Sequence, residues 1–247
     1  MNYHWNWHIF WETSPDGVNT YLDTLAAGTA WTLATALSAW VIALLLGLAV
    51  GIARTLRNRA LVALGNAYVE LFRNVPLLVQ MFLWYFVMPE VVPVPAGAWL
   101  KALPDAAFYT AVLALAFFTS ARVAVQVSAG IEALPRGLAL AATALGLTGA
   151  QTYRFVLLPI ALRLILPPLT SEFLNIIKNS SVALTIGLVE LTASARAIQE
   201  FSFQVFEAFT AATLIYLGIN ISVAYMMQLL ERRVAVPGFS VAGARGS

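Results

Sequence analysis

The sequence predicts an all-α integral membrane protein with about five transmembrane helices. Of the 247 residues, 60% are hydrophobic and only 11% are charged, whereas soluble domains are typically about 45–50% apolar and about 25% charged. A soluble fold of this length could not bury so much apolar surface, so lipid must cover part of it. The apolar residues are also gathered into long stretches, and arginines cluster in alternate connecting segments.

Five stretches have the roughly 20 apolar residues that a helix needs to cross a bilayer core about 30 Å thick. They are residues 30–53, 75–92, 106–131, 164–189 and 210–230. The second is the weakest, and its apolar character allows a start as early as Leu61. Gly47 and Gly51 form a G-x-x-x-G pair in the first stretch, which we interpret as a place where helices pack closely.

The basic residues predict the orientation of the chain in the membrane. Three arginines follow the first stretch, three lie between the third and the fourth, and three follow the fifth: Arg54, Arg57, Arg59, Arg136, Arg154, Arg163, Arg232, Arg233 and Arg245. The opposite loops hold only Lys101 and Arg196. By the positive-inside rule the N-terminus lies outside and the C-terminus in the cytoplasm. We therefore expect an external interfacial segment at residues 1–25, a transmembrane domain at 26–231 and a cytoplasmic tail at 232–247.

The N-terminal segment carries Trp5, Trp7 and Trp11, and indoles at this density before a span are typical of the headgroup region of a bilayer. His4 and His8 would share one helix face, but no third ligand is near, so we interpret them as interfacial residues and expect no metal site. The chain has no cysteine, which excludes disulfides and thiolate sites. Its net charge of +2 gives no reason to expect nucleic-acid binding.

The segment between the third and fourth stretches, at about residues 135–160, is the most informative part of the chain. Residues 138–145 are rich in Ala and Leu and should be helical, and Gly146 interrupts them. Residues 150–158 offer a second short helix that Pro159 ends. Apolar residues exposed to the cytoplasm favour docking of a partner protein, and the alternative is a re-entrant or surface-lying helix pair.

This loop resembles the EAA motif of the permease subunits of bacterial ATP-binding-cassette importers. That motif contains Glu-Ala-Ala, a Gly a few residues later and Leu-Pro near its end. The matching residues are Ala141, Ala142, Gly146, Leu158 and Pro159. Where the motif has Glu, this sequence has Leu140. The resemblance implies that residues 138–158 form coupling helices that dock in a groove of a cytoplasmic ATPase.

Two further segments resemble the polar amino-acid permeases. YVELFRNVPLLVQMFLWYF at residues 68–86 is similar to their second span, and PPLTSEFLNIIKNSSVALTIGLVEL at residues 167–191 is similar to their fourth. With the opening WNWHIF, these segments most resemble the permeases of glutamate/aspartate importers. The resemblance implies a type I importer permease fold in a bacterial inner membrane. It also implies two copies of a cytoplasmic ATPase, a periplasmic amino-acid-binding protein, and a second homologous permease or a second copy of this chain.

We expect no catalytic function in the chain itself. It contains no phosphate loop of the form G-x-x-x-x-G-K-[ST], and both histidines lie at the extreme N-terminus, where a Ser-His-Asp triad is not plausible. We therefore expect no cofactor in this chain and assign ATP hydrolysis to a separate subunit.

Three charged residues lie within apolar stretches: Arg122, Glu172 and Lys178. A charge in the hydrocarbon region costs about 2.5–3.5 kcal/mol on insertion scales, so such residues are candidates for function. In the family's usual A-Y-x-A-E pattern the Tyr position is Arg122 here and the Glu position is Val125. A guanidinium pairs well with a carboxylate at low dielectric, so we expect Arg122 to bind a substrate carboxylate. The alternative is a structural ion pair with Glu172.

Glu172, Asn175 and Asn179 are spaced i, i+3, i+7, which places them on one helix face. The resemblance implies that this stretch lines the translocation path, with Glu172 for the substrate ammonium group and the asparagines for neutral hydrogen bonds. The alternative is interhelical contacts, each worth about 0.6 kcal/mol. We add Thr119 to the expected path, whereas Lys178 points off the stripe.

Pro167 and Pro168 allow two interpretations. They either provide a hinge of the kind that alternating access needs or simply begin a helix, where proline is well tolerated.

The resulting hypothesis is the permease subunit of an ATP-driven importer for glutamate or aspartate. One alternative changes the cargo to glutamine or another polar amino acid, for which Arg122 would not be needed. A channel or a structural membrane subunit is a less favoured alternative, because such a protein does not need a cytoplasmic helical hairpin that ends in Leu-Pro.

Overall fold

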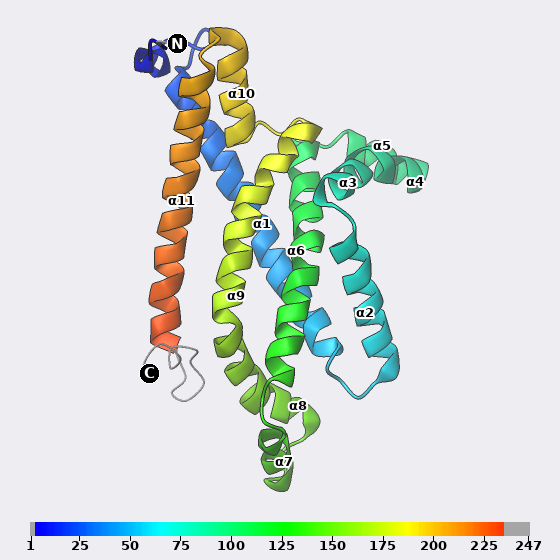
Figure 1. The fold of residues 1–247 in the computed structure, drawn as a ribbon. Coiled ribbons are helices and arrows are strands. Elements are labelled where there is room, and N and C mark those ends of the chain that lie inside the picture. The colour runs from blue at the N-terminus through cyan, green and yellow to red at the C-terminus, as the bar shows by residue number, and fades with distance from the viewer. Residues whose placement is uncertain (1–2, 235–247) are drawn as a thin grey trace. The chain divides into compact units, whose positions relative to one another are not determined.

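The computed structural model describes residues 3–234, and within them the chain forms helices and no β-strand (Figure 1). Four described segments are long and apolar enough to cross a membrane: Tyr21–Ala53, Ala106–Glu132, Gly149–Ile186 and Val205–Val234. A fifth crossing results if the bent pair Arg59–Asn74 and Leu77–Val91 counts as one span. The predicted all-α membrane fold is therefore confirmed. Most of the predicted tail, with Arg245, lies outside the described residues.

The helices of the described chain include two short segments of 3-10 helix, η1 and η4, and two short segments of π-helix, η2 and η3. In chain order the elements are η1 Trp7–Trp11, α1 Tyr21–Ala53, α2 Arg59–Asn74, α3 Leu77–Phe82, η2 Leu83–Val87, α4 Met88–Val91, α5 Val94–Lys101, α6 Ala106–Glu132, α7 Arg136–Ala144, α8 Gly149–Thr152, η3 Tyr153–Leu157, α9 Leu158–Asn179, η4 Ser180–Ile186, α10 Leu191–Ser202 and α11 Val205–Val234.

The described residues separate into two compact units. The first unit comprises residues 3–41, 75–116 and 175–222, and the second comprises residues 42–74, 117–174 and 223–234. Arg122 and Glu172 belong to the second unit, whereas Asn175 and Asn179 belong to the first.

The prolines near the predicted fourth stretch lie inside a helical run rather than at its ends. We expected Pro159 to end a short helix, but the run continues from Gly149 to Ile186. That prediction is wrong because the preceding turn η3 is π-helical, and its wider backbone spacing accommodates a residue without a backbone donor. Pro167 and Pro168 lie inside α9. Their interpretation as a helix start is therefore wrong, and their role as a hinge stays a prediction.

In the second unit, α6 packs closely against α1 and α9 through glycines. A Cβ atom added at Gly47 would lie 2.5 Å from Val123 Cγ1, and one added at Gly51 would lie 2.6 Å from Val127 Cβ. Gly130 of α6 makes a similarly close approach to α9. Small residues of this kind let helix backbones approach closely in membranes. There, van der Waals packing drives helix association, because the hydrophobic effect does not act between helices in lipid. The predicted role of the G-x-x-x-G pair is confirmed.

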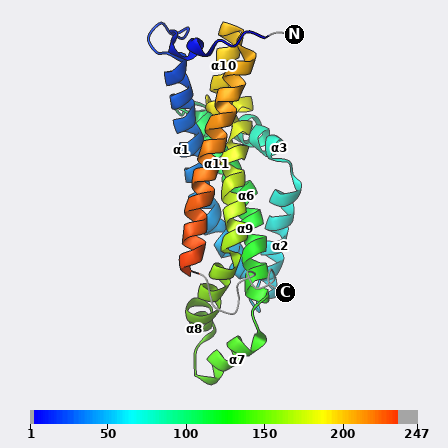
Figure 2. The same ribbon diagram turned by 60° about the vertical axis from the view of Figure 1, so that its left-hand side comes forward.

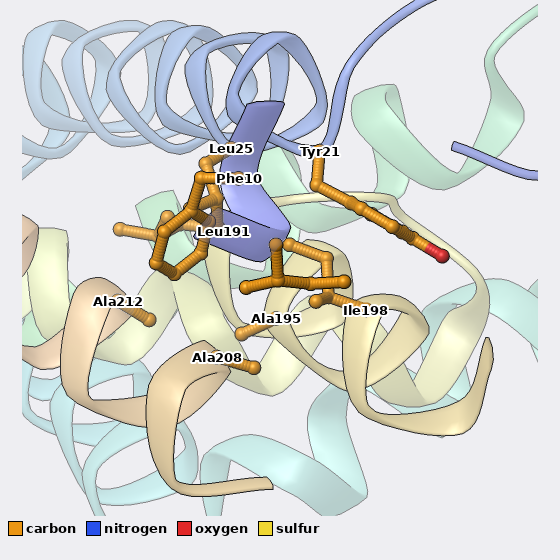
Figure 3. Close-up of a cluster of buried hydrophobic side chains, with 9 residues drawn as sticks. Phe10, Tyr21, Leu25, Leu191, Ala195, Ile198, Ala208 and Ala212 are labelled. Atoms are coloured by element: carbon orange, nitrogen blue, oxygen red, sulfur yellow. The ribbon is translucent and has the colours of Figure 1, made fainter. Parts of the chain in front are cut away.

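In the first unit, a cluster of buried apolar side chains joins the N-terminal segment to three helices. Figure 3 shows this cluster, with α10 and α11 contributing small residues where they meet. The cluster consists of Ile9, Phe10, Tyr21, Leu25, Leu191, Ala195, Ile198, Ala208 and Ala212. Since Ile9 and Phe10 are buried in it, η1 is fixed to the unit while Trp5, Trp7 and Trp11 stay exposed. Their predicted place among lipid headgroups stays a prediction.

A buried carboxylate begins α10 in the same unit. Glu190 is fully buried and caps the helix by accepting hydrogen bonds from the backbone N–H groups of Thr192 and Ala193, at 2.8 and 2.9 Å. The hydroxyl of Tyr216 on α11 donates a third, at 2.9 Å. Burial raises the pKa of Glu190, although all three hydrogen bonds favour its charged form. The carboxylate therefore ties α10 to α11.

We predict that Gly47→Ala lowers the melting temperature of the detergent-solubilised protein. The added methyl group must displace Val123, and overpacking of this kind costs about 1–3 kcal/mol. Gly218→Ala on α11 is the matched control, because nothing lies within 4 Å of the position of its added Cβ. Equal shifts for the two variants, measured by thermal unfolding, would show that α1 and α6 do not need this close approach.

Candidate functional site

A polar hollow of about 230 Å³ lies in the second unit and is lined by residues of α2, α6 and α9. It is lined by Arg73 of α2, by Arg122, Val125 and Gln126 of α6, and by Glu172 of α9. Three of its five residues carry a formal charge, which is rare inside a membrane domain and marks the hollow as the candidate site.

Arg122 and Glu172 face each other in this hollow. Arg122 Nη1 lies 3.6 Å from Glu172 Oε2, and the side chains are 40% and 13% exposed. Gln126 Nε2 donates a long hydrogen bond to Glu172 Oε1, at 3.3 Å. The guanidinium of Arg122 also lies 4.8 Å from the centre of the Phe118 ring, within the range of a cation–π contact. The ion pair that we gave as the alternative role of Arg122 is thus present in this structure.

Contacts between α2 and α6 set the position of Arg73. The hydroxyls of Tyr68 and Ser120 are 2.7 Å apart, and the rings of Phe72 and Phe117 stack with centroids 5.0 Å apart. Arg73 follows Phe72 directly in the last turn of α2 and lines the hollow. The sequence reasoning missed this residue because it precedes the apolar run that marks the second stretch.

Gln126 was also missed, although a signal was present. It lies four residues after Arg122, and residues at this spacing share one face of a helix. An amide on the same helix face as an arginine inside an apolar stretch could have been recognised from the sequence.

The other predicted path residues do not line this hollow. Thr119 lies one turn before Arg122 but is only 2% exposed, packed in the interior of the protein. Asn175 and Asn179 are half-buried residues of α9 in the first unit, and Lys178 beside them is exposed. Among residues 3–234 no group of three acidic, His or Cys side chains could hold a metal ion.

The loop between α6 and α9 forms the predicted helical hairpin, which Figures 1 and 2 show extending beyond the ends of the neighbouring helices of the second unit. α7 ends in a Schellman motif, in which Gly146 donates to Thr143 O at 2.9 Å and Leu147 donates to Ala142 O at 3.1 Å. Gly146 has a φ of +82°, a left-handed conformation that favours glycine. The predicted turn at Gly146 is therefore confirmed.

The second arm of the hairpin is fixed at both of its ends. Thr148 and Gln151 form a capping box at the start of α8, with each side chain bonded to the other residue's backbone N–H. In η3, the hydroxyl of Tyr153 donates to the backbone carbonyl of Thr55, at 2.9 Å, which ties the hairpin to the end of α1. The hairpin is thus a defined structure rather than a loose loop.

The hairpin presents apolar side chains outward. Leu140 is 70% exposed and Leu145 is 82% exposed, while Ala142 is buried. A hollow of about 740 Å³ separates the hairpin from the end of α1 and is lined by residues that include Thr55, Thr143, Tyr153 and Leu157. Among the predicted motif residues, Ala141 is exposed, and Leu158 and Pro159 are half-buried in the first turn of α9.

Comparison with known proteins supports the resemblance. Residues 43–236 match the family described as binding-protein-dependent transport system inner membrane component. This chain belongs to that family. It is therefore a transport subunit, and the family implies partners that bind the substrate and hydrolyse ATP.

Several relatives carry transport names. The glutamate/aspartate import permease protein GltJ of Escherichia coli (strain K12) is 49% identical over 96% of this chain and 98% of its own length. The probable glutamine ABC transporter permease protein GlnM of Bacillus subtilis (strain 168) is 32% identical over 89% of this chain and 95% of its own length.

Solved structures agree on the fold. A crystal structure of an amino acid ABC transporter with histidines superposes with a TM-score of 0.73 at 32% identity, covering 86% of this chain and 95% of that chain. The MetNI methionine ABC transporter in an inward-facing conformation gives a TM-score of 0.71 at 20% identity, covering 87% and 98%, and shows the fold alone.

We predict that Arg122 and Glu172 stabilise each other. In a double-mutant cycle of Arg122→Gln and Glu172→Gln, measured by thermal unfolding in detergent, we expect a coupling energy of about 1 kcal/mol because the pair is partly buried. The exposed Arg196–Glu200 pair of α10 is the control, with an expected coupling of about 0.3–0.5 kcal/mol. No coupling in the first cycle would mean that the two charges are held independently.

Proposed function

We propose that the chain is the permease subunit of an ATP-driven importer for glutamate and aspartate in a bacterial inner membrane. The observation that carries this proposal is the guanidinium of Arg122 in a hollow that also holds Glu172. The identity of 49% to a permease named for glutamate/aspartate import supports the same cargo.

The geometry suits a guanidinium that changes partners. The Arg122–Glu172 distance of 3.6 Å is longer than the 2.8 Å of the exposed Arg196–Glu200 pair. Because Arg122 is 40% exposed, a substrate carboxylate can reach it and form shorter bonds than Glu172 does. Glu172 is then free to accept the substrate's ammonium group.

Glutamine is the second candidate cargo. It is favoured by the 32% identity to the probable glutamine permease of Bacillus subtilis and by the 30% identity to the glutamine transport system permease protein GlnP of Escherichia coli (strain K12). A neutral amino acid presents one carboxylate and one ammonium group, so it does not need an additional cation along its path. The arginine at position 122 therefore favours an acidic cargo.

The family supports the assembly that we propose. The α7–α8 hairpin docks on a cytoplasmic ATPase present in two copies, and its exposed Leu140 and Leu145 provide the apolar contact. A second homologous permease, or a second copy of this chain, completes the translocation path. A periplasmic amino-acid-binding protein delivers the substrate on the side of residues 1–25.

The remaining predicted path residues keep supporting roles in this proposal. Asn175 and Asn179 supply neutral hydrogen bonds along the path, and Thr119 lies one turn before Arg122 on α6. Residues 26–231 constitute the transmembrane domain, and residues 232–247 constitute the cytoplasmic tail.

We predict that liposomes containing the full complex, with binding protein outside and ATP inside, take up labelled glutamate. Unlabelled aspartate should compete, whereas glutamine, histidine and arginine should not. Arg122→Tyr should abolish uptake or broaden it to neutral amino acids, because the cation that recognises the second charge is gone. Equal competition by glutamine, together with an Arg122→Tyr variant that only expresses poorly, would contradict the acidic assignment.

We predict that Gly146→Val lowers the ATPase activity that the binding protein stimulates through the permease. A β-branched residue is strained at φ +82°, at a cost of about 1–2 kcal/mol, so the turn and the docking surface should distort. Gly146→Asn is the matched control, since asparagine tolerates this conformation and nothing lies within 4 Å of the added Cβ. Binding-protein-stimulated ATPase activity should fall in the first variant and persist in the second. Full activity in Gly146→Val would exclude a role for this turn in coupling.

A further inference from the structure

The charges around the polar hollow do not cancel. Arg122 and Glu172 compensate each other as an ion pair, but Arg73 lines the same hollow with a second guanidinium. Arg73 is exposed, and among residues 3–234 it forms no ion pair. The hollow therefore carries one positive charge more than its own carboxylate neutralises.

We propose that Arg73 is a second carboxylate-binding residue and that the hollow is selective for a ligand with two carboxylates and one ammonium group. This inference rests on the proposed function, because it assigns a further specificity residue to the same site. Glutamate and aspartate carry a net charge of −1 at neutral pH, which matches the excess charge of the hollow.

The three charged side chains provide one partner for each charge of such a ligand. One guanidinium binds each carboxylate, and Glu172, released by Arg122, accepts the ammonium group with Gln126 beside it. Val125 is the one apolar lining residue and can contact the ligand's methylene groups. Glutamine has the same length but only one carboxylate, so it leaves one guanidinium without a charged partner.

The position of Arg73 is built into the packing of the second unit. The Tyr68–Ser120 hydrogen bond and the Phe72–Phe117 stack fix the last two turns of α2 against α6. On α6, Arg122 follows Ser120 by two residues, and Gln126 lies one turn after Arg122 on the face that lines the hollow. Arg73 is therefore held at the rim by rigid neighbours, which lowers the entropy lost when it binds a ligand.

A simpler role for Arg73 must be separated from this one. Arg73 lies in the last turn of α2, where a cation interacts favourably with the helix dipole, so its loss could weaken the fold without touching a ligand. A structural role would affect all ligands alike, whereas a carboxylate contact would affect only the ligand that has the second carboxylate.

The test measures equilibrium binding of labelled glutamate and labelled glutamine to the purified permease–ATPase complex, without binding protein and without nucleotide. Omitting the binding protein removes its own selectivity from the result. Arg73→Gln should bind glutamate about tenfold more weakly or worse, as expected for loss of a charge-assisted hydrogen bond, and should bind glutamine within about twofold of the wild type. Arg73→Lys keeps the charge and should recover part of the affinity for glutamate.

Arg59→Gln is the matched control, because Arg59 is an exposed arginine at the other end of α2 and does not line the hollow. It should leave both affinities unchanged. If Arg73→Gln weakens both ligands equally, or neither, the inference is overturned. If Arg122→Gln abolishes glutamate binding while Arg73→Gln leaves it unchanged, the inference about Arg73 fails but the proposed function stands. If the wild type binds no glutamate, or Arg122→Gln has no effect, the proposed function fails with it.

Discussion

The close approach of α6 to its neighbours is the constraint on which the second unit depends. Gly47 and Gly51 let the backbone of α1 contact Val123 and Val127, and Gly130 does the same for α9. In a membrane, lipid is as apolar as the side chains, so helices associate only where their surfaces fit. A helix packed on two sides in this way has little freedom to rotate, and the direction in which Arg122 points is fixed as a result.

The polar hollow is the consequence of that fixed direction. A guanidinium within a spanning helix must find a partner or water, because leaving it in hydrocarbon is costly. The pairing with Glu172 satisfies this need at a long distance, and Gln126 adds a weak hydrogen bond rather than a strong one. Loose pairing suits the substrate site that we propose here, since tight internal bonds would compete with the substrate.

Much of this architecture could be predicted from the sequence because its signals are periodic or local. The apolar stretches identified the spanning helices, and the glycine at position 146 identified the turn of the hairpin. The helix end predicted at Pro159 was wrong because the sequence does not show that a π-helical turn precedes this proline. Arg73 was missed because α2 is amphipathic and its last residues look like a connection, and only the stacking of Phe72 on Phe117 shows what they face. Features that depend on contacts between distant segments leave no periodic signal.

The hairpin has a mechanical consequence. One arm ends in a Schellman motif, the other begins with a capping box, and its base is tied through Tyr153 to the backbone of Thr55. If the hairpin docks on the ATPase as proposed, these contacts make its base follow a displacement of its tip. The same hairpin contacts the turn that follows α1 at that bond and continues into α9 through the π-helical turn. In the proposed transporter, a displacement of the hairpin would therefore reach the end of α1 and the start of α9 together.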